Sequence, residues 1–413
     1  MQDWRWPTYT PRNITLESVV HEGDNPNRGA VRVKAADGRV YLDAVGGIGC
    51  LPLGHSPKRW VDALTNQMNT LVSAAGPFWT KVNLELGRRI LDMSPVTDGR
   101  IFFGNTGTEV TEACIKVALK ATGRDMVVAF EKAFHGRTLG SVSMTANPKY
   151  RAGFVSTPGD GDDKRFAHMN VLRAPFGDLE ATAKLFEQYP DRIAMICLEP
   201  VQGEGGINPA TRDFLVGLHA LCRKHGALLA LDEIQAGSGR TGDFAAWSTL
   251  VGDDPALHCD IIWWAKAMGG GFPVAACVAR GDLAEHMVRG THGSTFGGNP
   301  LACRASMVTL DIMEEEGLFA SAGNQLGILK SIAASTPIAQ VKEVRGLGAM
   351  LGIEFGDADL VGKLISATAE QGLLVTGSGG TAIRWLFPYW ADEAILGEAW
   401  ERLGKAVEVA ANA

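Results

Sequence analysis

A lysine and an aspartate, each at the end of an apolar run, carry the strongest chemical signal in this chain. Lys266 follows the run DIIWWA and precedes AMGGGFP. A lysine held in an apolar site has a lowered pKa, so its free amine can act as a nucleophile and form a Schiff base with an aldehyde cofactor. The simpler alternative is a solvated lysine without a chemical role.

Asp232 ends the run ALLALD, which predicts a carboxylate at the carboxyl end of a buried strand. A carboxylate in that place needs a partner: a core salt bridge, a metal ion or a protonated pyridine nitrogen. No cluster of histidine, cysteine and acidic residues with metal-ligand spacing surrounds it, so a metal site is disfavoured. The pyridinium nitrogen is the favoured partner, because it needs a fixed anion to keep its proton.

The segment 102–120, FFGNTGTEVTEACIKVALK, has the pattern of a strand end, a glycine-containing turn and a helix that begins near Gly107 and Thr108. Free N–H groups and the helix dipole at such a start suit a phosphate, although a capped helix without a ligand has the same pattern. Neither a P-loop nor a GxGxxG after a strand is present, which disfavours nucleotides. A phosphate cradle, a strand-end aspartate and a strand-end lysine, in that order, together predict pyridoxal 5′-phosphate (PLP).

Short apolar runs alternate with helical patterns between about residues 80 and 300, and these elements must position the chemical groups. The runs predict buried strands at 126–130, 193–199, 227–232, 260–265 and 274–279. Continuous apolar strands between helices are typical of an α/β fold with a mostly parallel central sheet flanked by helices. Ligands of such sheets bind beyond the carboxyl ends of the strands.

Both ends of the chain predict a smaller α+β domain. Residues 31–42 alternate around Asp37-Gly38 as in a β-hairpin. Beyond about residue 320, the segments VRGLGAMLGIEF, LLVTGS and AIRWLF are separated by one helical stretch at 358–371. We therefore expect an N-terminal segment at 1–54 that contributes to the small domain, a large PLP-binding domain at 55–305 and a C-terminal small domain at 306–413.

Composition excludes several classes of protein. The 413 residues are 46% apolar and 21% charged, with a net charge of −7. This balance is that of a globular protein, and an acidic chain is a poor candidate for binding nucleic acid. The N-terminus lacks the apolar core of a secretory signal, and no apolar stretch is long enough to span a bilayer. Seven scattered cysteines without a CxxC pair are typical of reduced core thiols, so we expect a cytoplasmic protein with no nucleic-acid or membrane partner.

Eight segments resemble the class III (omega) aminotransferases of PLP fold type I, especially the ornithine, acetylornithine and GABA aminotransferases. They follow the family's order from about residue 30 to 390: FFGNTGTEVTEACIK, AFHGRTLGSVSMT, LEPVQGEGG, LALDEIQAGSGRTG, AKAMGGGFPVAA, GSTFGGNPLAC, VRGLGAMLGIE and AIRWLF. The resemblance implies the fold of that family, a homodimer with shared active sites, and transfer of a terminal amino group from an amine donor to a 2-oxo acid.

The resemblance also implies cofactor contacts. Lys266 would bind PLP covalently and act as the catalytic base, and Asp232 would pair with the ring nitrogen. The other implied contacts are a hydrogen bond near the ring hydroxyl from Gln235, a sandwich of the ring by Phe134 and Ile234, and phosphate contacts from Gly107, Thr108 and, from the other subunit, Thr295.

Four further residues resemble substrate-binding positions of the family. Arg137 in FHGRT would bind a distal carboxylate, and Arg384 would bind the α-carboxylate of 2-oxoglutarate, with Glu204 as a switch beside it. Ile48 in GGIG falls where relatives line the substrate pocket. Each arginine has a structural alternative, since Arg137 could tie a strand to a loop and Arg384 could form a structural salt bridge.

Some features depart from the family's pattern. AIRWLFPYW replaces the usual arginine-apolar-Pro-Pro-Leu, which affects the loop after Arg384. Phe78 and Trp79 put two bulky rings in a stretch that lines the pocket in relatives, where core packing and a substrate role both remain open.

The leading prediction of function is PLP-dependent transfer of a terminal amino group to 2-oxoglutarate, with pyruvate as the alternative acceptor. An aminomutase or amino-acid racemase of the same family would use the same lysine and aspartate, but would not need groups for two different carboxylates. A non-catalytic binding protein is disfavoured because Lys266, Asp232 and Thr295 are all present. The amine donor stays open among acetylornithine, ornithine, GABA, lysine and longer amines.

Overall fold

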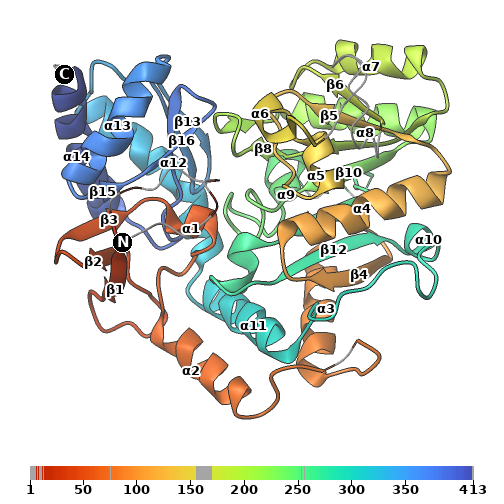
Figure 1. The fold of residues 1–413 in the computed structure, drawn as a ribbon, viewed down its shortest axis with the longest axis horizontal. Helices are drawn as coiled ribbons and strands as arrows, with labels where there is room; N and C mark the ends of the chain where they lie inside the picture. Colours follow the sequence, from red (N-terminus) through yellow and green to blue (C-terminus); the bar gives the residue numbers. More distant parts are fainter. Residues whose placement is uncertain are drawn as a thin grey trace.

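The computed structural model describes residues 6, 8, 12, 14–74, 76–154, 170–252, 254 and 256–411. Figure 1 shows two parts side by side, a larger one around a seven-stranded sheet and a smaller one that contains the N-terminal hairpin and the C-terminal helix. No helix among the described residues is long and apolar enough to cross a membrane.

The large sheet has the strand order β4-β12-β11-β10-β7-β5-β6. Its strands are β4 (Gly99–Gly104), β5 (Met126–Phe130), β6 (Asn170–Ala174), β7 (Ile193–Leu198), β10 (Leu228–Asp232), β11 (Ile261–Trp264) and β12 (Ala275–Arg280). The pairs from β11 to β6 are parallel, whereas β12 is antiparallel to both of its neighbours. The predicted mostly parallel sheet and its five predicted strands are therefore confirmed.

The reversed direction of β12 follows from its connection. Only residues 265–274 join β11 to β12, and a crossover between parallel strands needs a dozen or more residues. An apolar run such as VAACVA has the same composition in either direction, so the pattern of residues alone does not predict the reversal. Strand β6 was not predicted either, because NVLRA is short and carries an asparagine and an arginine.

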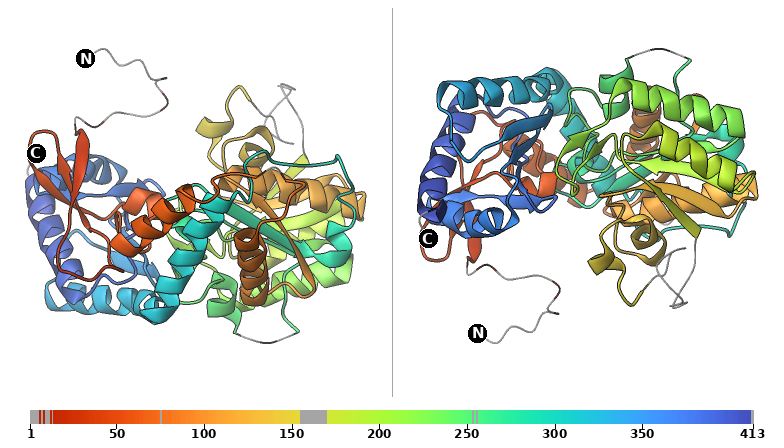
Figure 2. Two further views of the ribbon diagram at one scale, coloured as in Figure 1. Left: turned by 90° about the horizontal axis from the view of Figure 1, so that it is seen from below. Right: turned by 90° about the horizontal axis from the view of Figure 1, so that it is seen from above.

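Helices cover both faces of the large sheet (Figure 2). The helices of this part are α2 (Lys58–Met68), α3 (Lys81–Met93), α4 (Gly107–Thr122), α5 (Leu139–Met144), α6 (Pro148–Arg151), α7 (Leu179–Gln188), α8 (Arg212–His225), α9 (Ala246–Val251), η1 (Lys266–Gly269), α10 (Gly281–Ala284) and α11 (Pro300–Glu315). Alternate residues of β10 pack on opposite faces: Leu229 and Leu231 lie in the cluster with α8, and Ala230 lies in the cluster with α4. This alternation is the geometry of a strand buried on both sides.

The smaller part contains two four-stranded sheets. One has the order β1-β2-β3-β15 and the other β13-β14-β17-β16. Their elements are β1 (Leu16–Val20), β2 (Arg32–Ala35), β3 (Val40–Asp43), β13 (Glu343–Leu347), β14 (Met350–Glu354), β15 (Leu373–Leu374), β16 (Thr376–Ser378) and β17 (Ala382–Trp385), with α1 (Gly46–Gly49), α12 (Leu318–Ser335), α13 (Ala358–Glu370) and α14 (Glu393–Ala411).

Both chain ends build this smaller α+β domain. The predicted hairpin is confirmed, since β2 pairs antiparallel with β3 around Gly38, which has a φ of +87°. Leu42 of that hairpin pairs in parallel with Leu373 of β15, so residues far apart in the sequence share one sheet. The predicted domain boundaries at 54/55 and 305/306 stay predictions. A short two-stranded sheet, β8 (Val201–Gln202) with β9 (Asn208–Pro209), precedes α8.

Candidate active site

Residues that follow strands β4, β5, β7, β10 and β11 line a cavity of about 380 Å³. Nine of the residues predicted from the sequence line it: Gly107, Thr108, Phe134, Arg137, Glu204, Asp232, Ile234, Gln235 and Lys266. Arg384 does not line this cavity but hydrogen-bonds to two residues that do, Glu204 and Gln235. Ile48 and Thr295 are not among the lining residues.

Lys266 is the first residue of η1 and lies two residues beyond the end of β11. Its φ of +46° places a residue with a side chain in the left-handed region, a strained conformation that is concentrated at functional sites. Burial lowers the pKa of the Lys266 ammonium. The nearby Arg384 cation also lowers this pKa, whereas the Glu204 carboxylate raises it, and the net shift is downward. The site therefore favours a free amine, which is the nucleophilic form.

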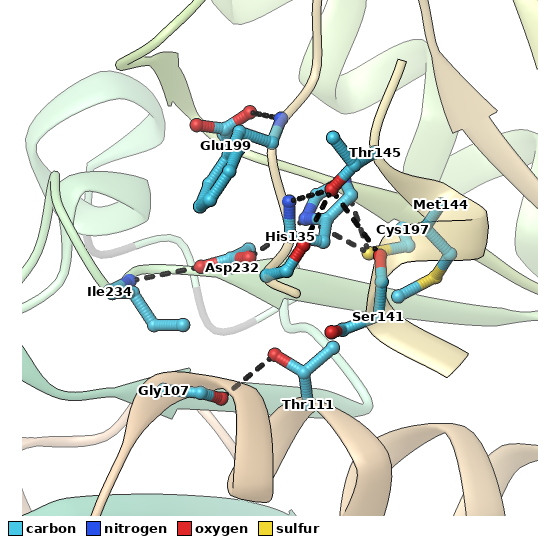
Figure 3. Close-up of polar contacts among 12 residues, drawn as sticks. Gly107, Thr111, His135, Ser141, Met144, Thr145, Cys197, Glu199, Asp232 and Ile234 are labelled. Atoms are coloured by element: carbon cyan, nitrogen blue, oxygen red, sulfur yellow. Dashed lines mark hydrogen bonds and ion pairs between the residues drawn. The ribbon is translucent and has the colours of Figure 1, made fainter. Parts of the chain in front are cut away.

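Asp232 is fully buried and both of its oxygens are engaged (Figure 3). Its Oδ2 lies 2.7 Å from Nδ1 of His135, and its Oδ1 accepts a hydrogen bond from the Ile234 amide at 3.1 Å. His135 is also fully buried, with Cys197 Sγ 3.7 Å from its Nε2. Burial opposes a charge on the imidazole, but Cys197 and Asp232 raise the pKa of His135 well above its usual value.

Sequence reasoning missed His135, although it lies between the predicted residues Phe134 and Arg137. The contact joins the loop after β5 to the end of β10, 97 residues along the chain. The pairing holds the Asp232 carboxylate in one orientation toward the cavity.

The start of α4 forms a tight cradle. Thr106 caps the helix in a capping box with Glu109, which leaves other N–H groups of the first turn without a partner within the helix. A Cβ atom at Gly107 would lie 2.6 Å from Ile234 Cδ1, so only glycine allows Ile234 to pack this closely. Thr108 Oγ1 lies 2.7 Å from the hydroxyl oxygens of both Thr138 and Ser141.

Glu199 is a second buried carboxylate that sequence reasoning missed. Its oxygens accept hydrogen bonds from the amides of Phe134 at 2.9 Å and Gly203 at 3.1 Å. Burial raises the pKa of Glu199 to about 7, against the lowering effect of His135. The sequence contained a signal for this residue, because Glu199 ends the apolar run IAMICLE as Asp232 ends ALLALD. In the structure, the pairing of Leu198 with Leu231 places the two strand ends side by side.

Arg384 reaches the site from β17 of the smaller domain and is 2% exposed. Its Nη1 lies 2.6 Å from Glu204 Oε1 and also donates to Gln235 Oε1 at 2.9 Å and to the Gly203 carbonyl at 3.0 Å. Burial opposes a charge on Glu204, but the Arg384 cation lowers the pKa of this carboxyl below its usual value. Arg384 and Glu204 thus form an ion pair in which the two charges neutralise each other.

Arg137 lies at the cavity in a different environment. No carboxylate of a described residue lies within 4.0 Å of its guanidinium, and its Cζ atom lies over the rings of Tyr150, at 3.7 Å from the centroid, and Phe134, at 5.4 Å. Among the described residues, the site therefore contains one neutralised arginine and one whose charge is not matched by an ion pair.

Four predicted or flagged positions lie away from the cavity. Ile48 is 43% exposed with a φ of +64°, and its neighbour Cys50 lines the cavity instead. Thr295 is exposed in the loop before α11, outside the cavity of its own chain. Phe78 and Trp79 are 72% and 77% exposed. The alternative that these rings pack in the core of their own chain is therefore wrong.

The residues of the cavity fit PLP. The helix start at Gly107 offers N–H groups to a phosphate, and Asp232 presents a fixed anion for a ring nitrogen. Ile234 and Phe134 supply apolar surface for a planar ring, and Lys266 supplies an amine with a lowered pKa.

Comparisons with known proteins agree with this geometry. The model of the family "Aminotransferase class-III" matches residues 22–407. The chain is 37% identical to the acetylornithine aminotransferase of Methanopyrus kandleri, over 92% of this chain and 93% of that protein. It is 36% identical to the acetylornithine aminotransferase of Corynebacterium efficiens, over 85% and 84% of the two chains.

Solved structures show the same architecture. An ornithine aminotransferase from Toxoplasma gondii, with partial occupancy of PLP at its active site, has a TM-score of 0.84 at 25% identity, over 99% of this chain and 93% of that one. An omega transaminase from Pseudomonas jessenii has a TM-score of 0.86 at 22% identity, over 98% and 97%, which bears on the fold alone. The predicted family, fold type and cofactor are confirmed. The chain belongs to the class III aminotransferases and is a PLP-dependent transaminase of fold type I.

Proposed function

We propose that this transaminase moves the terminal amino group of an ω-amino acid to 2-oxoglutarate, giving an aldehyde and glutamate. Acetylornithine is the first donor to test, because relatives at 36–37% identity are named acetylornithine aminotransferases; ornithine and GABA follow. The observation that carries the proposal is the pair of unlike arginines: Glu204 neutralises Arg384, whereas no carboxylate in the described part of the chain forms an ion pair with Arg137.

The two arginines match the two substrates. The donor's reacting carbon bears no carboxylate, so a cation beside that carbon must be neutralised, and Glu204 does this for Arg384. The reacting carbon of 2-oxoglutarate bears a carboxylate, which Arg384 can bind bidentately when Glu204 moves aside. Arg137 would hold the far carboxylate in both half-reactions.

PLP, when bound, supplies an electron sink for the carbon that bears the amine. The side chains of this enzyme orient the substrate and move the proton. Lys266 Nζ takes the proton from the reacting carbon of the substrate, since an amine with a lowered pKa is an effective base near neutral pH. Asp232, held by His135, would keep a proton on the ring nitrogen of the cofactor, and Gln235 would bind near the ring hydroxyl. Phe134 and Ile234 would shield the ring from water.

The proposal includes a homodimer in which Thr295 contacts the phosphate in the neighbouring subunit, and a cytoplasmic location. Large exposed apolar side chains support an interface between subunits: Phe78, Trp79 and Phe296 are 72%, 77% and 61% exposed. Such side chains usually mark an interaction site when they form a contiguous patch. All seven cysteines are free, which agrees with a reducing compartment.

The experiment is a panel of donors and acceptors with the purified holoenzyme. Acetylornithine, ornithine, GABA, 5-aminopentanoate and pentylamine would be offered with 2-oxoglutarate or pyruvate, and glutamate or alanine would be quantified. We expect glutamate formation, with carboxylate-bearing donors preferred to pentylamine. Alanine formation alone would make pyruvate the acceptor. Isomerisation of a single amino acid without any acceptor would identify an aminomutase or racemase instead.

A further inference from the structure

We propose that Tyr150 is a positioning residue for Arg137, and that its ring determines how tightly the enzyme holds the distal carboxylate of the amine donor. The inference rests on the proposed function, in which Arg137 binds that carboxylate.

Two aromatic rings hold the Arg137 guanidinium. The Arg137 Cζ atom lies 3.7 Å from the centroid of the Tyr150 ring and 5.4 Å from that of Phe134. The two rings meet edge to face, with centroids 6.1 Å apart and planes at 87°. The short distance to Tyr150 makes this ring the principal support of the cation.

An aromatic support has a different chemical effect from an ionic one. A ring face attracts a guanidinium through its quadrupole and leaves the cation's full charge available. A carboxylate partner would occupy the N–H groups and neutralise the charge, as Glu204 does for Arg384 at 2.6 Å. Arg137 is therefore fixed in place without losing its affinity for a carboxylate of the substrate.

The local backbone explains why Tyr150 lies there. Tyr150 belongs to α6, a turn capped by Asn147, whose side chain accepts a hydrogen bond from the Lys149 amide at 3.0 Å. The amide of Ala146 donates to the carbonyl of Ala133 at 2.8 Å, next to Phe134. One backbone link thus ties the turn that carries Tyr150 to the loop that carries Phe134 and Arg137.

The test compares Tyr150→Leu with Tyr150→Phe in the holoenzyme. Leucine removes the aromatic face, whereas phenylalanine keeps it and removes only the hydroxyl group. Donor binding would be measured in single-turnover experiments with 5-aminopentanoate and with pentylamine, which differ only by the carboxylate. Calorimetric titration with 5-hydroxypentanoate, which has no amine to react, would measure carboxylate binding without catalysis.

We expect Tyr150→Leu to weaken binding of 5-aminopentanoate and 5-hydroxypentanoate by about 3- to 30-fold, the range of a cation–π contact between exposed and desolvated sites. The limiting rate constant and pentylamine binding should change little, and Tyr150→Phe should behave like the wild type. A melting temperature near that of the wild type would show that Tyr150→Leu folds.

Unchanged carboxylate binding in Tyr150→Leu, or an equal loss for pentylamine, would overturn the inference. Arg137→Leu separates this failure from failure of the proposed function. If Arg137→Leu loses the preference for 5-aminopentanoate and Tyr150→Leu does not, Arg137 keeps its function and Tyr150 has no positioning role. If the wild type itself shows no preference for 5-aminopentanoate over pentylamine, both the proposed role of Arg137 and the inference are wrong.

Discussion

Arg384 Nη1 lies 2.6 Å from Glu204 Oε1, and the same nitrogen donates to Gln235 at 2.9 Å. The ion pair joins Arg384, in a strand of the smaller domain, to Glu204, in a loop of the larger one. Both domains therefore contribute side chains to this side of the active site. A buried cation with a carboxylate partner that is itself near the cavity can exchange that partner for a carboxylate of the substrate.

We expect Arg384→Ala to impair the two half-reactions unequally. The half-reaction with 2-oxoglutarate should lose about 3 kcal/mol, roughly 100-fold in rate, since removing one member of a buried charge pair is costly and the α-carboxylate loses its cation. The amine half-reaction should lose less. Single-turnover kinetics of each half would measure the difference.

Arg345→Ala is the matched control for that variant. Arg345 pairs with Glu354 at 2.6 Å and donates to the Gly206 carbonyl, so it also tethers this loop, but it does not line the cavity. It should lower stability without separating the half-reactions. Equal losses in both halves for Arg384→Ala would show that Arg384 is structural.

Gly203→Ala is expected to disrupt the contact between Gln235 and Arg384 by steric overlap. A Cβ atom at this position would overlap the Gln235 side-chain carbonyl, which accepts a hydrogen bond from Arg384. Overpacking of this kind typically costs about 1–3 kcal/mol, and activity should fall as Gln235 and Arg384 are displaced. Urea unfolding and steady-state kinetics would measure both effects.

Gly397→Ala provides the contrast, since nothing lies within 4 Å of a Cβ atom there and the residue sits inside α14. It should raise the free energy of unfolding by about 0.5–1 kcal/mol through helix propensity and leave activity unchanged. Normal activity in Gly203→Ala would mean that Gln235 can move without consequence.

The strand-end residues could be predicted from the sequence because apolar runs mark buried strands, and the carboxyl ends of parallel strands converge. Asp232, Lys266 and Gly107 needed no knowledge of tertiary contacts. His135 and Glu199 could not be assigned to partners in this way, because their contacts depend on strand order and register. The pairing of Leu42 with Leu373 and the direction of β12 depend on tertiary packing and loop length for the same reason.

His135→Phe should destabilise the site by removing the partner of Asp232. The change keeps a ring of similar size but leaves the buried Asp232 carboxylate without its partner at 2.7 Å, a loss that typically costs about 3–5 kcal/mol. We expect a lower free energy of unfolding for the cofactor-free protein and faster loss of PLP on dialysis. Chemical denaturation and the visible absorbance of the retained cofactor would measure these.

His219→Phe is a suitable comparison for that variant. His219 is buried in α8, and its Nε2 has no hydrogen-bond partner in the described part of the chain. Its replacement should change stability by less than about 1 kcal/mol and leave cofactor retention unchanged. Similar losses in the two variants would argue that His135 acts only by filling space.

Glu199→Gln should change how stability depends on pH. Burial raises the pKa of Glu199 to about 7 from its ordinary value of 4.5, so between these pH values the folded protein binds more protons than the unfolded chain. The free energy of unfolding contributed by this group therefore falls as pH rises from about 4.5 to 7, by roughly 3 kcal/mol in total. Glutamine does not titrate, so the variant should lack this fall.

Urea unfolding of the cofactor-free proteins at pH 5 and pH 7.5 would test this. The informative quantity is the difference between the two proteins in their change with pH, because other groups titrate equally in both. Glutamine has only one side-chain oxygen to accept the hydrogen bonds of the Phe134 and Gly203 amides, so the stability of the variant is expected to be lower throughout. Parallel pH profiles would show that Glu199 is already ionised at pH 5.

The last prediction concerns sharing of active sites between subunits. If Thr295 contacts the phosphate in the neighbouring subunit while Lys266 serves its own, two inactive variants should complement each other. Lys266→Ala removes the catalytic amine, and Thr295→Glu places a carboxylate where a phosphate is expected to bind. In a mixed dimer, one site receives Lys266 from the Thr295→Glu subunit and Thr295 from the Lys266→Ala subunit, and is intact. Random association of equal amounts would restore about a quarter of the wild-type activity, since half of the dimers are mixed and each has one intact site.

Refolding the two variants together, and separately as controls, would measure this restoration. Light scattering would establish the dimer in every sample. A mixture no more active than either variant alone would show that Thr295 does not act across the interface, and a fully active monomer would exclude shared sites altogether.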